Sequence, residues 1–273
     1  MSERLGVRRG FGSGWLWVLA LVALAATQVE AGKRGEPRSD EIPFDWQGEV
    51  AAGKWIEVRG INGSIEAVRG EGSEVVVRAI KRGKRDDPGE VDIRVERTAE
   101  GVLLCAHYPH PGGGMNEECE NQSVQNCDVA VQWRIELPEH VSLAAYTVNG
   151  SVSVENAPAD VNLVTVNGGI TASAAGAAEA TTVNGSIEIE MRAMPAEGAG
   201  ATFTTVNGDI TLRVAEHLDA NLRARTQNGR INCELPIERS GGSSRRRLAG
   251  QLGRGGPPLR LDTVNGSVTI EAL

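Results

Sequence analysis

Aromatic residues are scarce in this chain of 273 residues: Phe, Trp and Tyr make up 4% of it, although 40% of the residues are hydrophobic. A large globular core normally contains more aromatic side chains, so this composition favours an interior of Val, Ile, Ala and Leu. Basic charge is not in excess either, because the formal net charge is −8 at pH 7. That balance argues against nucleic acid as a partner. No stretch beyond the N-terminal segment has the periodicity of a helix.

Several sequence motifs that carry chemistry are also missing. There is no nucleophile elbow and no phosphate-binding loop. The Gly-Gly-x-Gly-x-Asp nonapeptide of calcium-binding β-rolls is absent as well. We therefore predict that the protein is not an enzyme and that it has no catalytic residues, no cofactor and no metal site.

What the sequence does contain is the phrase Thr-Val-Asn-Gly-Ser-Ile, repeated in seven close or looser copies. When the copies are aligned on the Asn, the third residue after it is Val or Ile in every copy, and the fourth is polar. The fifth is apolar again, so each copy alternates at the period of a strand with one apolar face. We predict that the asparagines form a structural turn ladder, made of Asn62, Asn149, Asn167, Asn184, Asn207, Asn228 and Asn265.

An Asn-Gly pair between apolar alternations usually marks a hairpin turn, which is the alternative interpretation. The spacing favours a solenoid instead, because the asparagines from Asn149 to Asn228 recur every 17 to 23 residues. Successive coils of a solenoid stack at about 4.8 Å, so that like residues lie over like. The Val and Ile columns then form the core, and the Thr and Asn columns form ladders. Asn and Gly both tolerate positive φ, so we expect the chain to turn a corner at each pair.

The fold predicted from these observations is an all-β, single-stranded β-solenoid of short stacked strands, forming one elongated domain over residues 44–273. Phe44 and Trp46 are expected to cap one end of the stack, since a terminal coil needs a lid that is not another coil. The last interval, from Asn228 to Asn265, is 37 residues long. We expect it to hold a coil without an Asn-Gly pair and an exposed Gly/Ser/Arg loop at residues 240–257.

Residues 1–31 have the pattern of an export signal: a basic start, a short apolar run and small residues before Gly32. We expect this signal peptide to be cleaved, which places the mature protein in the periplasm or at the cell surface without a membrane span. An uncleaved membrane anchor is the alternative, although the apolar run is short for a spanning helix. Residues 32–43 are charged and contain Pro, so they are predicted to be a flexible leader.

Three of the four cysteines, Cys105, Cys119 and Cys127, fall in a segment that we expect to be a disulfide-containing loop, residues 105–127. A disulfide is the default for such cysteines in an exported protein. A bond from Cys105 to Cys119 would close a loop of about 14 residues, and Cys127 competes for either partner.

Two further interpretations concern the cysteines. Cys105, His107 and His110 have a spacing that suits zinc, which is the alternative to a disulfide. Cys233 falls in an inward column of the repeat, so it is predicted to be a buried free thiol in a slot of the size of Val.

Several segments together resemble a known group of bacterial exported proteins: Phe44-Asp45-Trp46-Gln47-Gly48, Ile61-Asn62-Gly63-Ser64-Ile65, Asp87-Pro88-Gly89-Glu90-Val91, Cys105-Ala106-His107-Tyr108-Pro109, Leu252-Gly253-Arg254-Gly255-Gly256-Pro257 and Thr263-Val264-Asn265-Gly266-Ser267-Val268. The group is a domain of unknown function usually labelled putative adhesin. The resemblance covers about residues 44–273 and implies a β-solenoid and an envelope location. It offers no catalytic residues. It also implies Cys105 and Cys119 as the disulfide pair, with Cys127 as an extra cysteine.

The favoured function is that of a non-catalytic envelope protein, an adhesin-like binding or scaffold module. Its flat Thr/Ser-lined face would hold a cell-surface glycan or another envelope protein by many weak contacts. One alternative is a structural or stress-response component without a glycan ligand. Another is a polysaccharide-cleaving β-helix enzyme, for which Glu188, Glu190 and Asp209 are the available carboxylates. Arg245–Arg247 either contact an anionic polymer or belong to a solvated loop.

Overall fold

The computed structural model describes residues 41–119, 122, 124, 126–194, 200–240 and 244–273. These residues belong to the second of two units, Ser39–Leu273, and the first unit, Met1–Arg38, lies outside them. The predicted signal peptide and residues 32–40 of the predicted leader therefore also lie outside the described residues. Residues 41–43 of that leader are part of the first strand, because β1 begins at Glu41.

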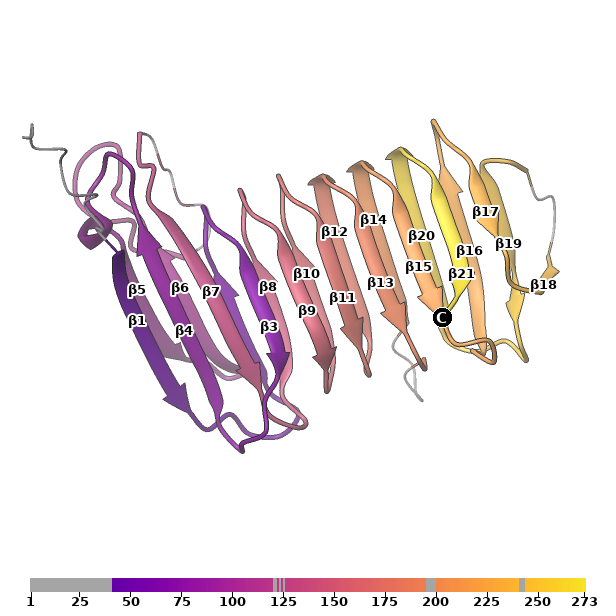
Figure 1. Ribbon diagram of the computed structural model, residues 1–273, viewed down its shortest axis with the longest axis horizontal. Helices are drawn as coiled ribbons and strands as arrows, with labels where there is room; N and C mark the ends of the chain where they lie inside the picture. The colour runs from indigo at the N-terminus through magenta and orange to yellow at the C-terminus, as the bar shows by residue number, and fades with distance from the viewer. Residues whose placement is uncertain (1–40, 120–121, 123, 125, 195–199, 241–243) are drawn as a thin grey trace, which may run out of the picture. The chain divides into compact units, whose positions relative to one another are not determined.

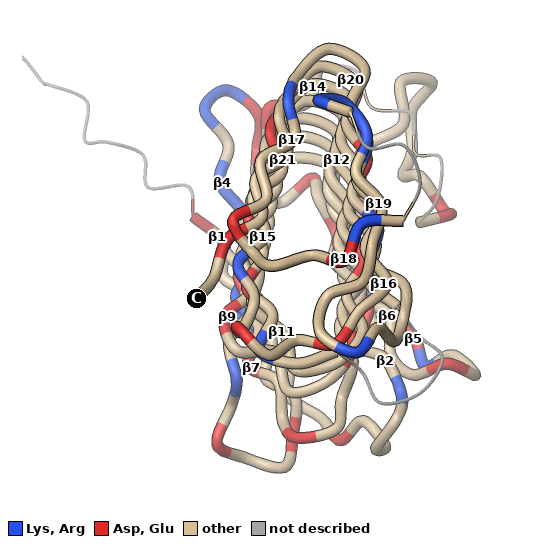
Figure 2. Tube along the Cα trace, turned by 90° about the vertical axis from the view of Figure 1, so that its right-hand side faces the viewer, with Lys and Arg blue, Asp and Glu red and all other residues tan. Residues whose placement is uncertain are grey.

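Two sheets face each other and enclose the core (Figures 1 and 2). The ten-stranded sheet has the following strands, in their order across it: β1 (Glu41–Gly48), β4 (Val75–Arg82), β7 (Ala130–Leu137), β3 (Ile65–Arg69), β9 (Val152–Ala157), β11 (Ile170–Ala174), β13 (Ile187–Met191), β15 (Ile210–Val214), β21 (Val268–Ala272) and β17 (Ile231–Cys233).

The eleven-stranded sheet is the opposite wall. Its strands, in order from the same end of the stack, are β5 (Asp92–Arg97), β6 (Gly101–His107), β2 (Trp55–Arg59), β8 (Ser142–Tyr146), β10 (Val161–Val164), β12 (Ala178–Asn184), β14 (Ala201–Asn207), β20 (Pro258–Asn265), β16 (Ala220–Thr226), β19 (Arg247–Leu252) and β18 (Ile237–Arg239). A short 3-10 turn, Pro88–Glu90, is the only helical element among the described residues.

The prediction of an all-β solenoid is confirmed. Each coil places one strand in each wall, and neighbouring coils pair in parallel, as β12 does with β14 and β13 does with β15. The ends differ from the repeat, because their pairings are antiparallel: β1 with β4 and β5 with β6 at one end, and β16 with β19 at the other. Phe44 and Trp46 lie in the terminal strand β1 and pack half-buried against the core, where the caps were expected.

The order in which the coils stack differs from their order in the sequence. The C-terminal coil, β20–β21, lies between the coil β14–β15 and the coil β16–β17. The predicted extra coil between Asn228 and Asn265 is wrong, because that interval holds an antiparallel hairpin, β18–β19. The predicted exposed loop at 240–257 is wrong for residues 247–252, which form β19. Since β19 occupies the outer edge of β16, the last coil finds its partners on the inner side.

The core consists of the columns that the repeat predicts. The third residue after the motif Asn is buried in six copies, and these residues are in register across the ten-stranded sheet: Ile65, Val152, Ile170, Ile187, Ile210 and Val268. From the opposite wall, Phe203 is fully buried and lies in register with Ala180 and Leu261. One large ring among small aliphatic neighbours fills the space between the walls, which explains why so few aromatic residues suffice.

Among the described residues, no helix is long and apolar enough to cross a bilayer.

A pair of neighbouring substitutions tests the facing of the strands. Ile187→Ala is expected to lower the free energy of unfolding by about 2–5 kcal/mol, because Ile187 is fully buried and its truncation leaves a cavity. Glu188→Ala, one residue away on the exposed face, is expected to change it by less than about 0.5 kcal/mol. Urea denaturation of the two variants measures both values. Equal losses would contradict the facing described here.

Candidate functional site

The predicted asparagines lie one above another along a corner of the stack. From the second Asn of the stack onward, each side-chain amide donates a hydrogen bond of 2.8–2.9 Å to the Oδ1 of the Asn that precedes it in the stack. The order is Asn62, Asn149, Asn167, Asn184, Asn207, Asn265 and Asn228, which follows the stacking of the coils. Apart from Asn62, these side chains are exposed, so the ladder lies on the surface and does not satisfy buried groups.

The glycines of the motif have a different role from the one expected. None of the seven motif asparagines has a positive φ, and of the motif glycines, all of which the structure describes, Gly63 alone does. A Cβ on Gly185 would collide with the carbonyl group of Gly168 in the neighbouring coil, and the same collision recurs at each coil. The corner therefore needs glycine because two backbones approach closely there, and the prediction from positive φ is wrong.

The threonines of the motif are buried, with 1–6% of their surface exposed. Their hydroxyls point into the stack: Thr182 Oγ1 donates to the Gly168 carbonyl oxygen at 2.9 Å, and the other copies repeat this bond at 2.7–3.0 Å. This column therefore does not form the hydroxyl-lined outer face that the sequence predicted. On the outside of the ten-stranded sheet, the corresponding outward column includes Ser153, Thr171, Glu188 and Thr211, in that order.

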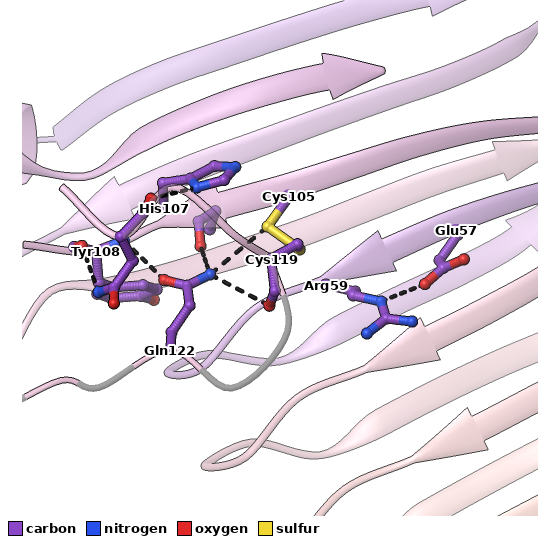
Figure 3. Close-up of a disulfide and its surroundings, with 9 residues drawn as sticks. Glu57, Arg59, Cys105, His107, Tyr108, Cys119 and Gln122 are labelled. Atoms are coloured by element: carbon purple, nitrogen blue, oxygen red, sulfur yellow. Dashed lines mark hydrogen bonds and ion pairs between the residues drawn. A yellow bond between two sulfur atoms is a disulfide. The ribbon is translucent and has the colours of Figure 1, made fainter. Parts of the chain in front are cut away.

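The disulfide-containing loop covers the outer face of β6 (Figure 3). Cys105 and Cys119 are joined, with their Cα atoms 5.9 Å apart. Because the sulfur of Cys105 is bonded to another sulfur, the alternative zinc site lacks its thiolate. His107 is buried, and its Nδ1 lies 2.7 Å from the carbonyl oxygen of Asn116. Among the described residues, no group of three His, Cys, Asp or Glu side chains could hold a metal ion.

Gln122 and Tyr108 hold this loop in place, and neither role could be recognised from the sequence pattern. Gln122 Nε2 donates to the Ala106 carbonyl oxygen at 2.9 Å, and its Oε1 accepts from the Tyr108 amide at 3.0 Å. The Tyr108 hydroxyl donates to the Asn62 carbonyl oxygen at 3.3 Å. Burial raises the pKa of Tyr108 to about 12. The loop is thereby attached to the first residue of the asparagine ladder.

Cys127 and Cys233 are free thiols among the described cysteines. Cys233 is half-buried, so its predicted full burial is wrong. The cause is that Cys233 lies on β17, the last strand of the ten-stranded sheet, where no further coil covers it. Burial raises the pKa of both thiols.

The three carboxylates considered for catalysis have separate surroundings. Glu190 lies 3.8 Å from Arg213, which also pairs with Glu271 at 2.8 Å. Asp209 Oδ1 accepts a hydrogen bond of 2.7 Å from the Ser267 amide. Glu188 faces outward beside Thr211 of the next coil. An acid and a base that share one substrate atom are not formed by this arrangement.

A groove of about 470 Å³ crosses the outer face of the eleven-stranded sheet. It begins at Trp55 on β2 and ends at Arg260 on β20. Between these ends, the groove is lined by Asn162, Glu179 and Thr202, which lie on β10, β12 and β14. Five strand spacings separate its ends, which is about 24 Å. The sequence did not predict this groove, because Trp55 is remote in the chain from the other lining residues.

A second hollow of about 340 Å³ lies near the asparagine corner of the same face. Its lining includes Arg225, Arg247 and Asp262, together with Val206 and Val264 from the motif. Val206 exposes 37% of its surface, so this Val column is outside the core. Arg247 belongs to β19, whereas Arg245 and Arg246 are exposed beside its start.

Two glycine substitutions test the close approach of the coils. Gly185→Ala is expected to lower the free energy of unfolding by at least about 1–3 kcal/mol, because the methyl group would meet backbone atoms of the adjacent coil. Gly72→Ala is the control, since a Cβ there would be 3.9 Å from its nearest neighbour, and a change under about 0.5 kcal/mol is expected. Thermal or urea denaturation provides the measurement. A tolerant Gly185 would contradict the role given to the corner.

Thiol titration tests the cysteine assignments. The denatured but unreduced protein is expected to show two free thiols per chain, Cys127 and Cys233, and four after reduction. Cys233→Ser should reduce the first number to one. No free thiol in the unreduced protein would mean that Cys127 and Cys233 are also bonded.

Comparison with known proteins gives a family and distant structural neighbours. No curated protein matches the chain. A structure titled as a putative cell adhesion protein from Clostridium sporogenes is 14% identical, with 85% of this chain and 100% of that chain covered and a TM-score of 0.45. A putative adhesin from Bacteroides fragilis is 13% identical, with 87% and 99% covered and a TM-score of 0.39. A putative adhesin from Parabacteroides merdae is 11% identical, with 85% and 96% covered and a TM-score of 0.23.

The family model described as Toastrack DUF4097 matches residues 134–271, which is about half of the chain and includes six of the seven Asn-Gly pairs. The match spans the coils from β7 to the C-terminal strand β21. This protein is therefore a member of the toastrack DUF4097 family.

Proposed function

We propose that this protein is a non-catalytic, exported envelope protein that binds a glycan along the outer face of its eleven-stranded sheet. The observation that carries the proposal is the groove from Trp55 to Arg260. It is long, open and lined by residues of successive coils, a geometry that suits a chain of sugars more than a compact small molecule. A glycan lying in it would follow the direction in which the coils stack.

Trp55 is the aromatic residue of the groove. It is half-buried, so one part of the indole is held by the protein while another part remains accessible. A flat indole stacks on the apolar face of a sugar ring and excludes water from it, and its N–H is available for a hydrogen bond. Because aromatic residues are scarce in this chain, an accessible indole at the start of the groove is an uncommon feature of its surface.

Polar side chains line the rest of the groove. Asn162, Glu179 and Thr202 come from three successive strands in matching register, so the same outward position offers an amide, a carboxylate and a hydroxyl in turn. These groups hydrogen-bond to sugar hydroxyls as donors or acceptors. Each contact is weak alone, but several along one polymer combine into useful affinity.

The Cys105–Cys119 disulfide supports export. Disulfides form and persist in oxidising compartments such as the periplasm and the cell surface. The absence of turnover is supported by the surroundings of Glu188, Glu190 and Asp209, each of which has its own partner or faces solvent alone.

Binding of the mature protein, residues 32–273, to immobilised cell-wall polysaccharides tests the proposal. Wild-type protein is expected to bind at least one glycan without releasing reducing sugar. Trp55→Ala is expected to weaken this binding by about tenfold, since burying about 60 Å² of apolar surface between the indole and a sugar ring contributes about 1.5 kcal/mol. Equilibrium binding and a reducing-sugar assay provide the two measurements.

Trp46→Ala serves as the matched control. Trp46 is also half-buried, but it lies on β1 of the opposite sheet, so its loss should leave glycan affinity unchanged. Thermal melts of both variants verify that they are folded. Failure of the wild-type protein to bind any glycan would point to the structural or stress-response role, and released sugar would show that it is an enzyme.

A further inference from the structure

Four arginines gather at the end of the eleven-stranded sheet where the groove ends. Arg260 is on β20, Arg223 and Arg225 are on β16, and Arg247 is on β19, three strands that are neighbours in the sheet. All four are exposed, while the residues that alternate with them are buried: Leu222, Ala224, Leu248, Leu259 and Leu261. The arginines therefore point outward. We call these four residues the arginine patch, and Figure 2 shows basic residues on the β19 side of this wall.

The register places like charges directly opposite each other. Arg223 is paired with Arg260 across the parallel strands, and Arg225 is paired with Arg247 across the antiparallel strands. Like charges at such positions destabilise a sheet. Within the part of the chain that the structure describes, none of these four side chains forms an ion pair.

A second pair of opposed arginines shows how the same fold compensates elsewhere. Arg78 and Arg134 lie opposite each other in the ten-stranded sheet. Arg78 pairs with Glu136 at 2.5 Å, and Arg134 lies 3.7 Å from Glu66. The arginine patch has no such set of acids, so its charge is available to a ligand.

The acidic residues near the arginine patch do not neutralise it. Asp262 lies in register beside Arg225, and Glu179 lines the same groove as Arg260, two strands away in the same register. Against four arginines these two carboxylates leave a local charge of about +2. Asp219 accepts a hydrogen bond of 2.7 Å from the Arg254 amide and pairs with its guanidinium at 2.8 Å, contacts that hold the pKa of Asp219 below its usual value. A local excess of positive charge in a chain of net charge −8 marks a specific surface.

The arginine patch is continuous with both hollows of this face. Arg260 lines the end of the groove, and Arg225 and Arg247 line the hollow beside it. A polymer that lies on Trp55 and follows the groove would therefore reach the guanidinium groups next. The planar guanidinium binds carboxylate, sulfate and phosphate groups through two parallel hydrogen bonds.

We infer that the glycan bound in the groove is an acidic polysaccharide, whose anionic groups contact Arg223, Arg225, Arg247 and Arg260. This inference rests on the proposed function, since it names the ligand class of the same groove. A polysaccharide suits the site better than nucleic acid does, because the patch is short and the chain as a whole carries a net charge of −8. A duplex carries about one charge per 1.7 Å and would extend well beyond the patch.

Two matched pairs of polymers test the inference: polygalacturonate against its fully methyl-esterified form, and dextran sulfate against dextran. Each pair keeps the sugar backbone and removes the charge, and the two pairs distinguish carboxylate from sulfate. The mature protein is expected to bind at least one acidic polymer about tenfold or more tightly than its neutral partner at low salt. Raising the ionic strength should weaken the acidic interaction and leave the neutral one nearly unchanged.

Arg223→Gln and Arg225→Gln are each expected to weaken binding of the acidic polymer by about fivefold. Because neither residue lines the groove, both variants are expected to leave binding of the neutral partner unaffected. Arg97→Gln is the control, because Arg97 is also exposed and forms no ion pair with any described residue, but lies on β5, at the far end of the same sheet. Thermal melts establish that each variant is folded.

The outcomes separate the two proposals. Equal binding of the acidic and neutral polymers, with sensitivity to Trp55→Ala but not to the arginine variants, overturns the inference and leaves the proposed function standing. Binding of no polysaccharide overturns both. Single-stranded DNA and vesicles containing phosphatidylglycerol are the remaining probes, and binding of either one as tightly as the acidic polymer overturns the inference in favour of a general polyanion or membrane surface.

Discussion

The close approach of two backbones at the asparagine corner is the constraint on which the rest of this structure depends. Gly63 lies against the carbonyl group of Val131, and the other six of the seven motif glycines lie against that of the glycine in a neighbouring coil, so no side chain fits between the two backbones. That carbonyl oxygen accepts a hydrogen bond from a buried threonine, as Gly168 does from Thr182. The asparagine amides continue the connection at the surface. Three positions of one short motif thus fix the spacing and the register of the coils, and the aliphatic columns follow from that register.

Much of the fold was predictable because the aligned copies of a repeat show which residues lie beside each other in neighbouring coils. The alternation around each asparagine identified the buried columns, and the near-constant interval identified parallel stacking of the coils. The physical role of single positions was less accessible. Positive φ and close backbone approach both require glycine, and the sequence does not distinguish them. A threonine on a strand is equally compatible with an outer face and with a buried hydroxyl that has an acceptor, so the sequence did not show to which side Thr182 and its counterparts point.

The ends and the binding face were less predictable, because they depend on contacts between segments that are remote in the sequence. Periodicity cannot show that β19 would pair with β16 in the antiparallel direction, and that pairing changes the position of the last coil. The groove likewise joins Trp55 to Arg260, residues from opposite ends of the domain. The arginine patch has the same origin, since Arg223 and Arg260 are neighbours only through the inserted coil. A repeat therefore predicts its own interior well, whereas its sites arise where the repeat is interrupted.

The position of the C-terminal coil has a consequence for how the chain acquires its structure. Coils that stack in sequence order can be added one at a time as the polypeptide emerges from a ribosome or a translocation channel. Here β20–β21 must enter between β14–β15 and β16–β17, so those two coils cannot be joined until the last residues have emerged. Within the segment from Ala220 to Leu252, β16 and β17 obtain their parallel neighbours, β20 and β21, only after those two later strands have been made. Closure of this end is thus a late, non-local step, which is the kind of step that slows folding. A chain truncated before Pro258 would leave this end of the stack open, because β16 and β17 would have no parallel partner.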